Sequence, residues 1–423
     1  MKSARTLLRN ASVYTGANIL NAGIPFLLLP VLTRVLSPTD YGTIAMFGIV
    51  VSIVGAFTGL SVHGAVGVRY FQLDRQRMPP YVGTCLAILT VSSSVVFCVV
   101  AVGRSWLELI TRVPGDWLLV AVLVSCAQFV VNIRLSLWQV QQKAFRYGVF
   151  QISQSLLNAG LSLFLILRLG MAWEGRALGQ AAAVTVFMLI ALFLLLRRNE
   201  ASWPSTTSDA RDALKFGVPL IPHVIGGLLI ATTDRFMITN MLDVAQAGIY
   251  MVALQMGMVL GLLTDSFNIA YAPYLMETLV KEDRARDRRI VRGTYAYFIV
   301  VTVLALLLGV TAPHLLGVLV GERFRAAAGA VFYVSMGYAF GGMYYMVANY
   351  VFLMSKTGYL AVVTFASGVF NIIATYFLIK LNGVIGAAQA FMISQAMIFL
   401  CTWWLAHSFR PMPWREALFP ENT

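Results

Sequence analysis

The recurrence of long apolar segments constrains this chain more than any other feature of its sequence. A helix needs about 20 apolar residues to cross a bilayer, because the hydrocarbon core is about 30 Å thick. Such segments follow one another from end to end, in a chain with 59% hydrophobic and 12% charged residues. The pattern predicts an all-α polytopic membrane protein with about twelve transmembrane helices, at approximately 11–33, 41–66, 81–103, 117–138, 149–167, 177–196, 217–239, 247–270, 293–312, 326–352, 359–379 and 384–406.

The positions of the basic residues predict how the chain is oriented. Most of the 31 Lys and Arg residues lie in alternate connections, beginning with the N-terminal segment "MKSARTLLRN". The positive-inside rule places those connections in the cytoplasm, and an even number of spans makes both termini cytoplasmic. This arrangement accounts for the net charge of +13 without nucleic-acid binding. We interpret the first span as an uncleaved helix, since no small-residue cleavage site marks a cleaved signal peptide, the alternative reading.

The connections between spans offer no place for catalysis. They are too short for a soluble catalytic or nucleotide-binding domain, and no G-x-x-x-x-G-K-[ST] motif occurs. Cys85, Cys98, Cys126 and Cys401 all lie in predicted spans without a C-x-x-C pair. We interpret them as core residues and not as disulfides or ligands. We therefore expect a protein that is not an enzyme, with no catalytic residue, metal or cofactor.

The two halves of the chain are similar to each other. The longest connection, 197–216, is rich in Ser, Thr, Asp and Arg and contains Pro204, which is typical of a linker. It predicts an N-terminal six-helix bundle (1–198), a cytoplasmic linker (199–216) and a C-terminal six-helix bundle (217–423). Residues of the first half recur in the second at nearly constant offsets: Gly55, Gly59 and His63 match Gly257, Gly261 and Asp265, and Arg34 matches Arg235. Because each half has an even number of spans, the halves form a parallel repeat about an axis along the membrane normal.

Two opposite charges, Asp234 and Arg235, stand side by side in the apolar stretch "IATTDRFMITN". A charged residue at the centre of an inserting helix costs about 2.5–3.5 kcal/mol, so an ionisable residue there is a functional candidate. Adjacent helical residues point about 100° apart, which predicts that these two side chains give each other no useful help. Each is then expected to find a partner elsewhere, or water.

Four stretches of the chain together resemble a known family of proteins. They are "LPVLTRVLSPTDYGTIAMFG" (29–48), "WEGRALGQAAA" (173–183), "TTDRFMITNMLDVAQAGIYMVA" (232–253) and "FNIIATYFLIKLNGVIGAAQA" (370–390). The chain resembles the polysaccharide flippases of the Wzx type, which belong to the multidrug, oligosaccharidyl-lipid and polysaccharide exporter superfamily. The resemblance covers essentially the whole sequence.

This resemblance implies both a fold and a function. The fold is two six-helix bundles in a V shape around a central cavity. The function is movement of an undecaprenyl-diphosphate-linked oligosaccharide, an O-antigen or exopolysaccharide repeat unit, from the cytoplasmic to the periplasmic leaflet of a bacterial inner membrane by alternating access. The implied partners are this lipid-linked oligosaccharide, membrane lipids, a proton or sodium ion for coupling, and other glycan assembly proteins.

Five residues are candidates for lining the path of the substrate: Arg34, Arg235, Arg134, Asn18 and Asn21. Arg34 and Arg235 are expected near the external ends of the first and seventh spans, where a guanidinium can bind diphosphate oxygens bidentately. Asn18 and Asn21 belong to a polar stripe of the first span, and amides can hydrogen-bond sugar hydroxyls. The alternatives are hydrogen bonding between helices for the asparagines and snorkelling to the interface for the arginines, Arg134 included.

Three titratable residues are candidates for ion coupling: Asp265, His63 and Asp234. His63 and Asp265 end glycine-lined faces at matching positions of the two halves, and both are expected within spans. Histidine titrates near pH 6.5, and burial moves a carboxylate toward the same range, so either could exchange a proton during transport. The alternatives are a structural salt bridge, such as Asp265 with Arg134, and a hydrogen bond from His63 to a carbonyl.

Two other functions compete with the flippase. A drug or toxin extruder of the same superfamily would need an acidic cavity that attracts cations, and the intramembrane charges favour arginine over carboxylate only slightly. A membrane glycosyltransferase or glycan polymerase would be expected to have a large loop or domain with catalytic motifs, and the short connections argue against it.

Overall fold

The computed structural model describes residues 2–203, 206–279, 284–354 and 357–414. Within these ranges the chain is almost entirely helical and contains no β-strand, which confirms the predicted all-α class. The chain divides into two compact units, Met1–Asn240 (unit 1) and Met241–Thr423 (unit 2).

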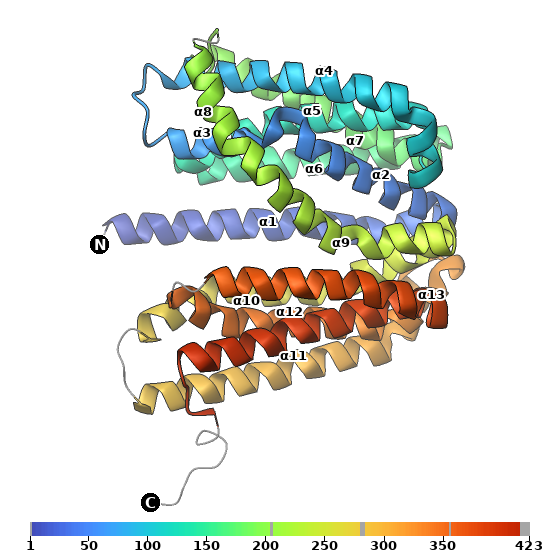
Figure 1. Cartoon of the computed structure of the whole chain (residues 1–423). Coiled ribbons are helices and arrows are strands. Elements are labelled where there is room, and N and C mark those ends of the chain that lie inside the picture. Colours follow the sequence, from blue (N-terminus) through green and yellow to red (C-terminus); the bar gives the residue numbers. More distant parts are fainter. Residues whose placement is uncertain (1, 204–205, 280–283, 355–356, 415–423) are drawn as a thin grey trace, which may run out of the picture. The chain divides into compact units, whose positions relative to one another are not determined.

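Unit 1 is built around α5, which packs against α2, α4 and α7, while α6 packs between α1 and α7 (Figure 1). The bounds of its helices are α1 (Lys2–Val35), α2 (Pro38–Phe57), α3 (His63–Arg69), α4 (Met78–Thr111), α5 (Gly115–Val140), α6 (Ala144–Leu169), α7 (Trp173–Arg197), α8 (Thr207–Gly217) and α9 (Ile221–Met241).

Local sequence signals set several helix ends. The Ser37 hydroxyl accepts a hydrogen bond from the backbone N–H of Asp40 at 3.1 Å, and the Asp40 carboxylate accepts one from the N–H of Ser37 at 2.9 Å. This reciprocal capping box, with Pro38 in the first turn, starts α2. Gly170 takes a φ of 66° to end α6, a conformation that glycine adopts without a Cβ penalty.

The predicted span 41–66 is not one helix, which corrects the expectation from hydropathy. α2 ends at Phe57, and a 3-10 turn, Thr58–Ser61, leads into α3. Gly59 has a φ of 72°, a conformation that side chains with a Cβ rarely adopt. The ring of Phe129 on α5 fills the space where a Cβ would stand, 2.1 Å from its ideal position. The break therefore depends on backbone freedom and on a close approach together.

Connections predicted to be cytoplasmic lie together at one end of unit 1. Arg69, after the second span, pairs with Asp212 of α8 at 2.6 Å, and Arg77 pairs with Asp209 of α8 at 3.1 Å. The segment 199–216, expected to be a linker between bundles, therefore holds a helix that is tied to the N-terminal bundle. The compact unit continues beyond it to Asn240.

Unit 2 is built around α12, which packs against α10, α11 and α13 (Figure 1). The bounds of these helices are α10 (Val244–Leu279), α11 (Arg284–Leu319), α12 (Ala328–Leu353) and α13 (Thr357–Phe409). The backbone of α13 breaks at Gly383, with φ 57° and ψ −135°. This break lies between the predicted spans 359–379 and 384–406.

The described helices cover the twelve predicted spans. Among the described residues, 10 helical stretches are long and apolar enough to cross a membrane. One of them, Tyr359–Phe409, contains two predicted spans on either side of Gly383. The first predicted span corresponds to a shorter apolar helix, Ile19–Val35. The chain is thus a multi-pass membrane protein.

Candidate functional site

Half-buried amide and hydroxyl groups of α1, α5 and α6 form two hydrogen-bonded groups inside unit 1. Ser155 of α6 donates to the amide oxygen of Asn21 on α1. Gln154 of α6 donates to Gln128 of α5 at 3.1 Å, and Gln128 donates to Asn132 at 3.0 Å. We call these five residues the polar seam. Neutral groups that can both donate and accept suit hydroxyl-rich ligands as well as contacts between helices.

Arg176, near the start of α7, contacts polar residues of α6 that begin one turn beyond the polar seam. Its guanidinium donates to Ser162 Oγ at 2.9 Å and to the side-chain oxygen of Asn158, both on α6. Among the described residues no carboxylate forms an ion pair with Arg176. Neutral partners orient a guanidinium without cancelling its charge, so Arg176 can attract an anion.

Arg176 directly precedes the predicted span 177–196, and the sequence analysis did not place it in a site. A signal was present on α6, where polar residues recur at helical spacing: Gln151, Gln154, Ser155, Asn158 and Ser162. Such a stripe puts these side chains on one face of the helix. Of the two asparagines predicted from the first span, Asn21 belongs to the polar seam, and the side chain of Asn18 lies outside the described residues.

Asp234 and Arg235 do pair with each other, which corrects the expectation from helical geometry. The Nε of Arg235 lies 3.3 Å from Asp234 Oδ1, and the backbone N–H of Arg235 donates to the same oxygen at 2.7 Å. The guanidinium also donates to the carbonyl of Ala231, one turn earlier. A long arginine stem can turn back toward the N-terminus of its helix, so the direction of the Cα–Cβ bond does not limit its reach.

Arg34 and Arg134 have opposite environments. Arg34 lies in the last turn of α1 and is exposed. Arg134 on α5 is 0% exposed, forms an ion pair with Glu200 after α7, and places its guanidinium 4.5 Å from the ring centre of Trp138. Arg134 is therefore enclosed by unit 1, where a substrate cannot reach it, and its partner is Glu200 and not Asp265.

Glu200 is held as a carboxylate by its surroundings. Burial acts to raise its pKa, but hydrogen bonds from Arg134 and Gln141, with the nearby charge of Lys143, hold the pKa of this carboxyl below its usual range. The Gln141 amide donates to Glu200 at 2.9 Å. The end of α5 is thus fixed to the end of α7.

The two residues expected to end matching glycine-lined faces have different settings. His63 begins α3, and its ring meets Phe129 edge-on with centroids 5.3 Å apart. Its Nδ1 is buried and has no hydrogen-bond partner among the described residues. Asp265 lies within the span Val244–Ile269 of α10, where it is exposed and interacts electrostatically with Tyr345 of α12. Acidic residues in spans usually face a bundle interior or a water-filled cavity, which makes Asp265 a functional candidate.

Unit 2 carries aromatic and amide groups on α10 just after Asp265 in the sequence. Phe267 stacks on Tyr297 of α11 with centroids 4.7 Å apart and on Tyr271 at 5.4 Å. Asn349 of α12 donates to Asn268 at 3.1 Å. The sequence pattern puts Asn268 on the same helix face as Asp265, but it did not identify the aromatic stack or Asn349.

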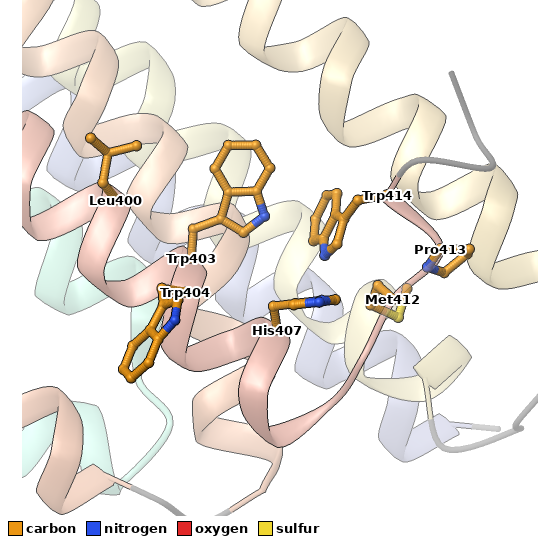
Figure 2. A pocket seen from close by; sticks show the side chains of 7 residues that line it. All are labelled: Leu400, Trp403, Trp404, His407, Met412, Pro413 and Trp414. Carbon is orange, nitrogen blue, oxygen red and sulfur yellow. The ribbon is translucent and has the colours of Figure 1, made fainter. Parts of the chain in front are cut away.

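A pocket of about 550 Å³ lies where the chain turns back after α13 (Figure 2). Figure 2 shows Trp403 and Trp414 on one side and His407 between Trp404 and Met412. The Tyr295 hydroxyl of α11 donates to the carbonyl of Trp414 at 3.3 Å, which holds the returning segment in place. Aromatic rings with one polar edge are typical of membrane interfaces, so this pocket is best explained as an interfacial anchor of unit 2.

Comparison with known proteins places this chain in a family. The sequence model of the family described as "Polysaccharide biosynthesis protein" matches residues 7–279. A Haemophilus influenzae protein named for the Lsg locus is 22% identical over 357 residues, covering 83% of this chain and 86% of that protein.

Solved structures share the fold at low identity. The lipid II flippase MurJ in an inward closed conformation has a TM-score of 0.70 at 12% identity, covering 98% of this chain and 88% of that one. A mutant of the Vibrio cholerae MATE transporter VcmN has a TM-score of 0.62 at 13% identity, covering 96% and 98%. The family match spans more than half of the sequence, and the chain therefore belongs to the polysaccharide biosynthesis protein family.

Proposed function

We propose that this protein moves a lipid-diphosphate-linked oligosaccharide from the cytoplasmic to the periplasmic leaflet of a bacterial inner membrane, by alternating access and with both termini in the cytoplasm. Family membership and the fold shared with a lipid II flippase support a flippase. The proposal depends most on the surroundings of Arg176. This arginine lies in a membrane span, its hydrogen-bond partners are neutral, and these partners follow the polar seam along α6.

The chemistry of the cargo matches these groups. A diphosphate needs cationic donors, and a guanidinium can bind two phosphate oxygens at once. Sugar hydroxyls need groups that both donate and accept, which the amides of the polar seam supply. The polar head must be shielded from hydrocarbon while the lipid tail stays in the bilayer, so flipping needs such groups at membrane depth.

We assign Arg176 to the diphosphate and Asn21, with the rest of the polar seam, to the glycan. Arg34, Arg235 and Asn18 stay proposed contributors, with Asp234 orienting Arg235 directly through their ion pair. Arg134 is assigned to the internal bracing of unit 1 because it is fully enclosed. Asp265 is proposed as the residue that couples transport to a proton or sodium gradient.

The test is flipping of a fluorescent lipid-diphosphate oligosaccharide in proteoliposomes. Arg176→Gln should abolish most of the flipping, and Arg176→Lys should recover only part of it, because an ammonium cannot reproduce bidentate binding. Arg168→Gln is the matched control, since Arg168 is an exposed arginine in the last turn of α6. Wild-type flipping by a correctly folded Arg176→Gln protein would remove Arg176 from the site.

One observation favours a second candidate, a cation extruder. Asp265 presents an exposed carboxylate within a span, and the MATE transporters share this fold. The same proteoliposomes can be loaded with a cationic dye. Gradient-driven dye movement that Asp265→Asn abolishes, in the absence of lipid flipping, would favour extrusion over flipping.

A further inference from the structure

The helix between the two halves, α8, has two faces with different charges. Its carboxylates face the N-terminal bundle, where Asp212 accepts hydrogen bonds from Arg69 at 2.7 Å and from Tyr81 at 3.1 Å. Its basic residues, Arg211 and Lys215, are exposed, and no hydrogen bond or ion pair joins them to another described residue. Lys215 interacts only at longer range with Asp212, whose charge Arg69 already balances. The outer face of α8 is therefore cationic.

An apolar groove lies along α8, against Ala210 and Leu214, which precede the two cations in the sequence. It has a volume of about 750 Å³ and lies between α4, the turn after α2, and α8. Residues of α4 form one wall, among them Val91 and Val95, which are 67% and 58% exposed. A second hollow of about 900 Å³ shares Ala210 and Leu214 of α8 with the groove and is bordered by Arg211 and Lys215. The two hollows thus have three lining residues of α8 in common, Thr207, Ala210 and Leu214.

We propose that this groove binds one anionic phospholipid, with an acyl chain along α4 and the phosphate on Arg211 and Lys215. The charges are complementary to a phosphate, and basic pockets beside transmembrane helices are typical sites for anionic headgroups. The acyl chain gains little by leaving a bilayer that is equally apolar, so the two cations determine selectivity and the groove determines position. The site is separate from Arg176 and the polar seam, and it does not depend on the transported cargo.

The position of the site gives the lipid a structural role. α8 continues through a 3-10 turn, Val218–Leu220, into α9. Ion pairs with Arg69 and Arg77 hold the inner face of α8 against α3 and α4. A phospholipid on the outer face holds α8 from the other side, so anionic lipid stabilises the start of α9 as well as the bundle end.

The test is titration of the full-length, delipidated protein with phosphatidylglycerol, followed by native mass spectrometry. The double variant Arg211→Gln/Lys215→Gln should bind phosphatidylglycerol roughly thirtyfold more weakly, as expected for the loss of two basic residues at a lipid headgroup. Phosphatidylcholine should bind the wild-type protein weakly and should not distinguish the two proteins. The matched control, Arg146→Gln/Arg198→Gln, removes two exposed basic residues that do not border the groove and should bind within threefold of wild type.

A second pair of variants tests the groove without changing charge. Val91→Trp fills the groove and should weaken phosphatidylglycerol binding, whereas Val102→Trp, on the same helix, 90% exposed and outside the groove, should not. Equal binding by the charge variant and its control would overturn the proposal. So would a polyprenyl phosphate that displaces phosphatidylglycerol and binds more tightly, because the groove would then belong to the tail of the transported lipid.

Discussion

The second spans of the two halves share one spacing of glycines, but their backbones fold differently. In unit 1, Gly59 takes a φ of 72° and α2 stops, so that His63 begins a new helix. In unit 2, the matching Gly261 stays helical, and α10 continues as one helix to Leu279. A Cβ on Gly261 would lie 2.7 Å from the ring of Tyr338 on α12.

The difference shows that one glycine pattern serves two physical purposes. At Gly59 the glycine supplies a backbone conformation that other residues reach only with strain. At Gly261 it supplies the absence of a side chain, so that α12 can approach α10 closely. A match between halves therefore identifies corresponding positions without identifying what each position does.

Replacing Gly59 should have the largest effect on this comparison. Gly59→Ala forces a Cβ into left-handed backbone, at about 1–2 kcal/mol, and into the ring of Phe129, at about 1–3 kcal/mol more. We expect a loss of about 2–5 kcal/mol in the free energy of unfolding, measured by thermal and denaturant unfolding in detergent. Gly48→Ala is the control, because α2 is regular there and a Cβ would meet nothing within 4 Å.

A double-mutant cycle separates the two causes at Gly59. Phe129→Ala removes the ring that stands 2.1 Å from the ideal Cβ position but leaves the backbone conformation unchanged. The coupling between the two substitutions should therefore equal the steric part alone, about 1–3 kcal/mol. Additive effects would mean that Phe129 does not determine the need for glycine.

The second prediction concerns His63 and Asp265, which the glycine pattern treats as equivalents. We expect only Asp265 to couple transport to a gradient, because it is exposed within a span while His63 packs on Phe129. Moving one charge through 100 mV supplies about 2.3 kcal/mol, so coupling can accelerate flipping up to roughly fiftyfold.

Flipping in proteoliposomes with and without an imposed gradient measures this difference. Asp265→Asn should reduce the rate under a gradient to the rate without one, and His63→Gln should keep the response of the wild type. Asp243→Asn is the matched control, since Asp243 is an exposed carboxylate just before α10 and outside its span. A retained gradient response in Asp265→Asn would contradict the assignment.

The third prediction is the counterpart of the first in unit 2. Gly261→Ala meets the Tyr338 ring at 2.7 Å but needs no unusual backbone. The clash costs about 1–3 kcal/mol, and the better helix propensity of alanine returns about 1 kcal/mol, so we expect a net loss of no more than about 2 kcal/mol in the free energy of unfolding. Tyr338→Leu should remove most of the penalty. A loss as large as that of Gly59→Ala would mean that the two positions do not differ in why they need glycine.

Hydropathy was sufficient to predict the spans, because the cost of burying polar backbone in lipid forces each apolar segment into a helix. It could not predict the break at Gly59, which depends on the backbone conformation of one residue and on Phe129, far away in the sequence. The same limit applied to Gly383, where the break happened to fall between two predicted spans.

The candidate site was predicted only in part. Intramembrane charges were identified from the sequence, but their partners were not, because Arg134 pairs with a residue 66 positions later. The pairing of Asp234 with Arg235 was wrongly excluded because side-chain length was left out of the argument. Arg176 was missed because the polar stripe of α6, which orients it, was not considered.

The smallest expected effect concerns the contacts that join the ends of helices within each unit, which we call the closure of that unit. Unit 1 joins α5 to α7 through the ion pair of Arg134 and Glu200. Unit 2 joins α11 to the segment after α13 through the uncharged Tyr295 and Trp414, and also through a longer ion pair of Asp287 and Arg410, with N and O atoms 3.9 Å apart. Because the folded state lowers the pKa of Glu200, its contribution to stability is complete above the usual carboxyl range, about pH 4.3, and is lost as the pH falls through the lower, folded pKa.

Acidification below about pH 4.3 should therefore weaken the closure of unit 1 more than that of unit 2, where the contact between Tyr295 and Trp414 carries no charge. Hydrogen exchange measured by mass spectrometry between neutral pH and acid can follow both ends, after correction for the intrinsic pH dependence of exchange. Glu200→Gln should remove this acid response at the end of α7 while lowering protection at every pH, since Arg134 is then left buried without a counter-charge. An equal acid response around Trp414 would show that charge does not distinguish the two closures, and the contrast between the units would then be limited to their glycines.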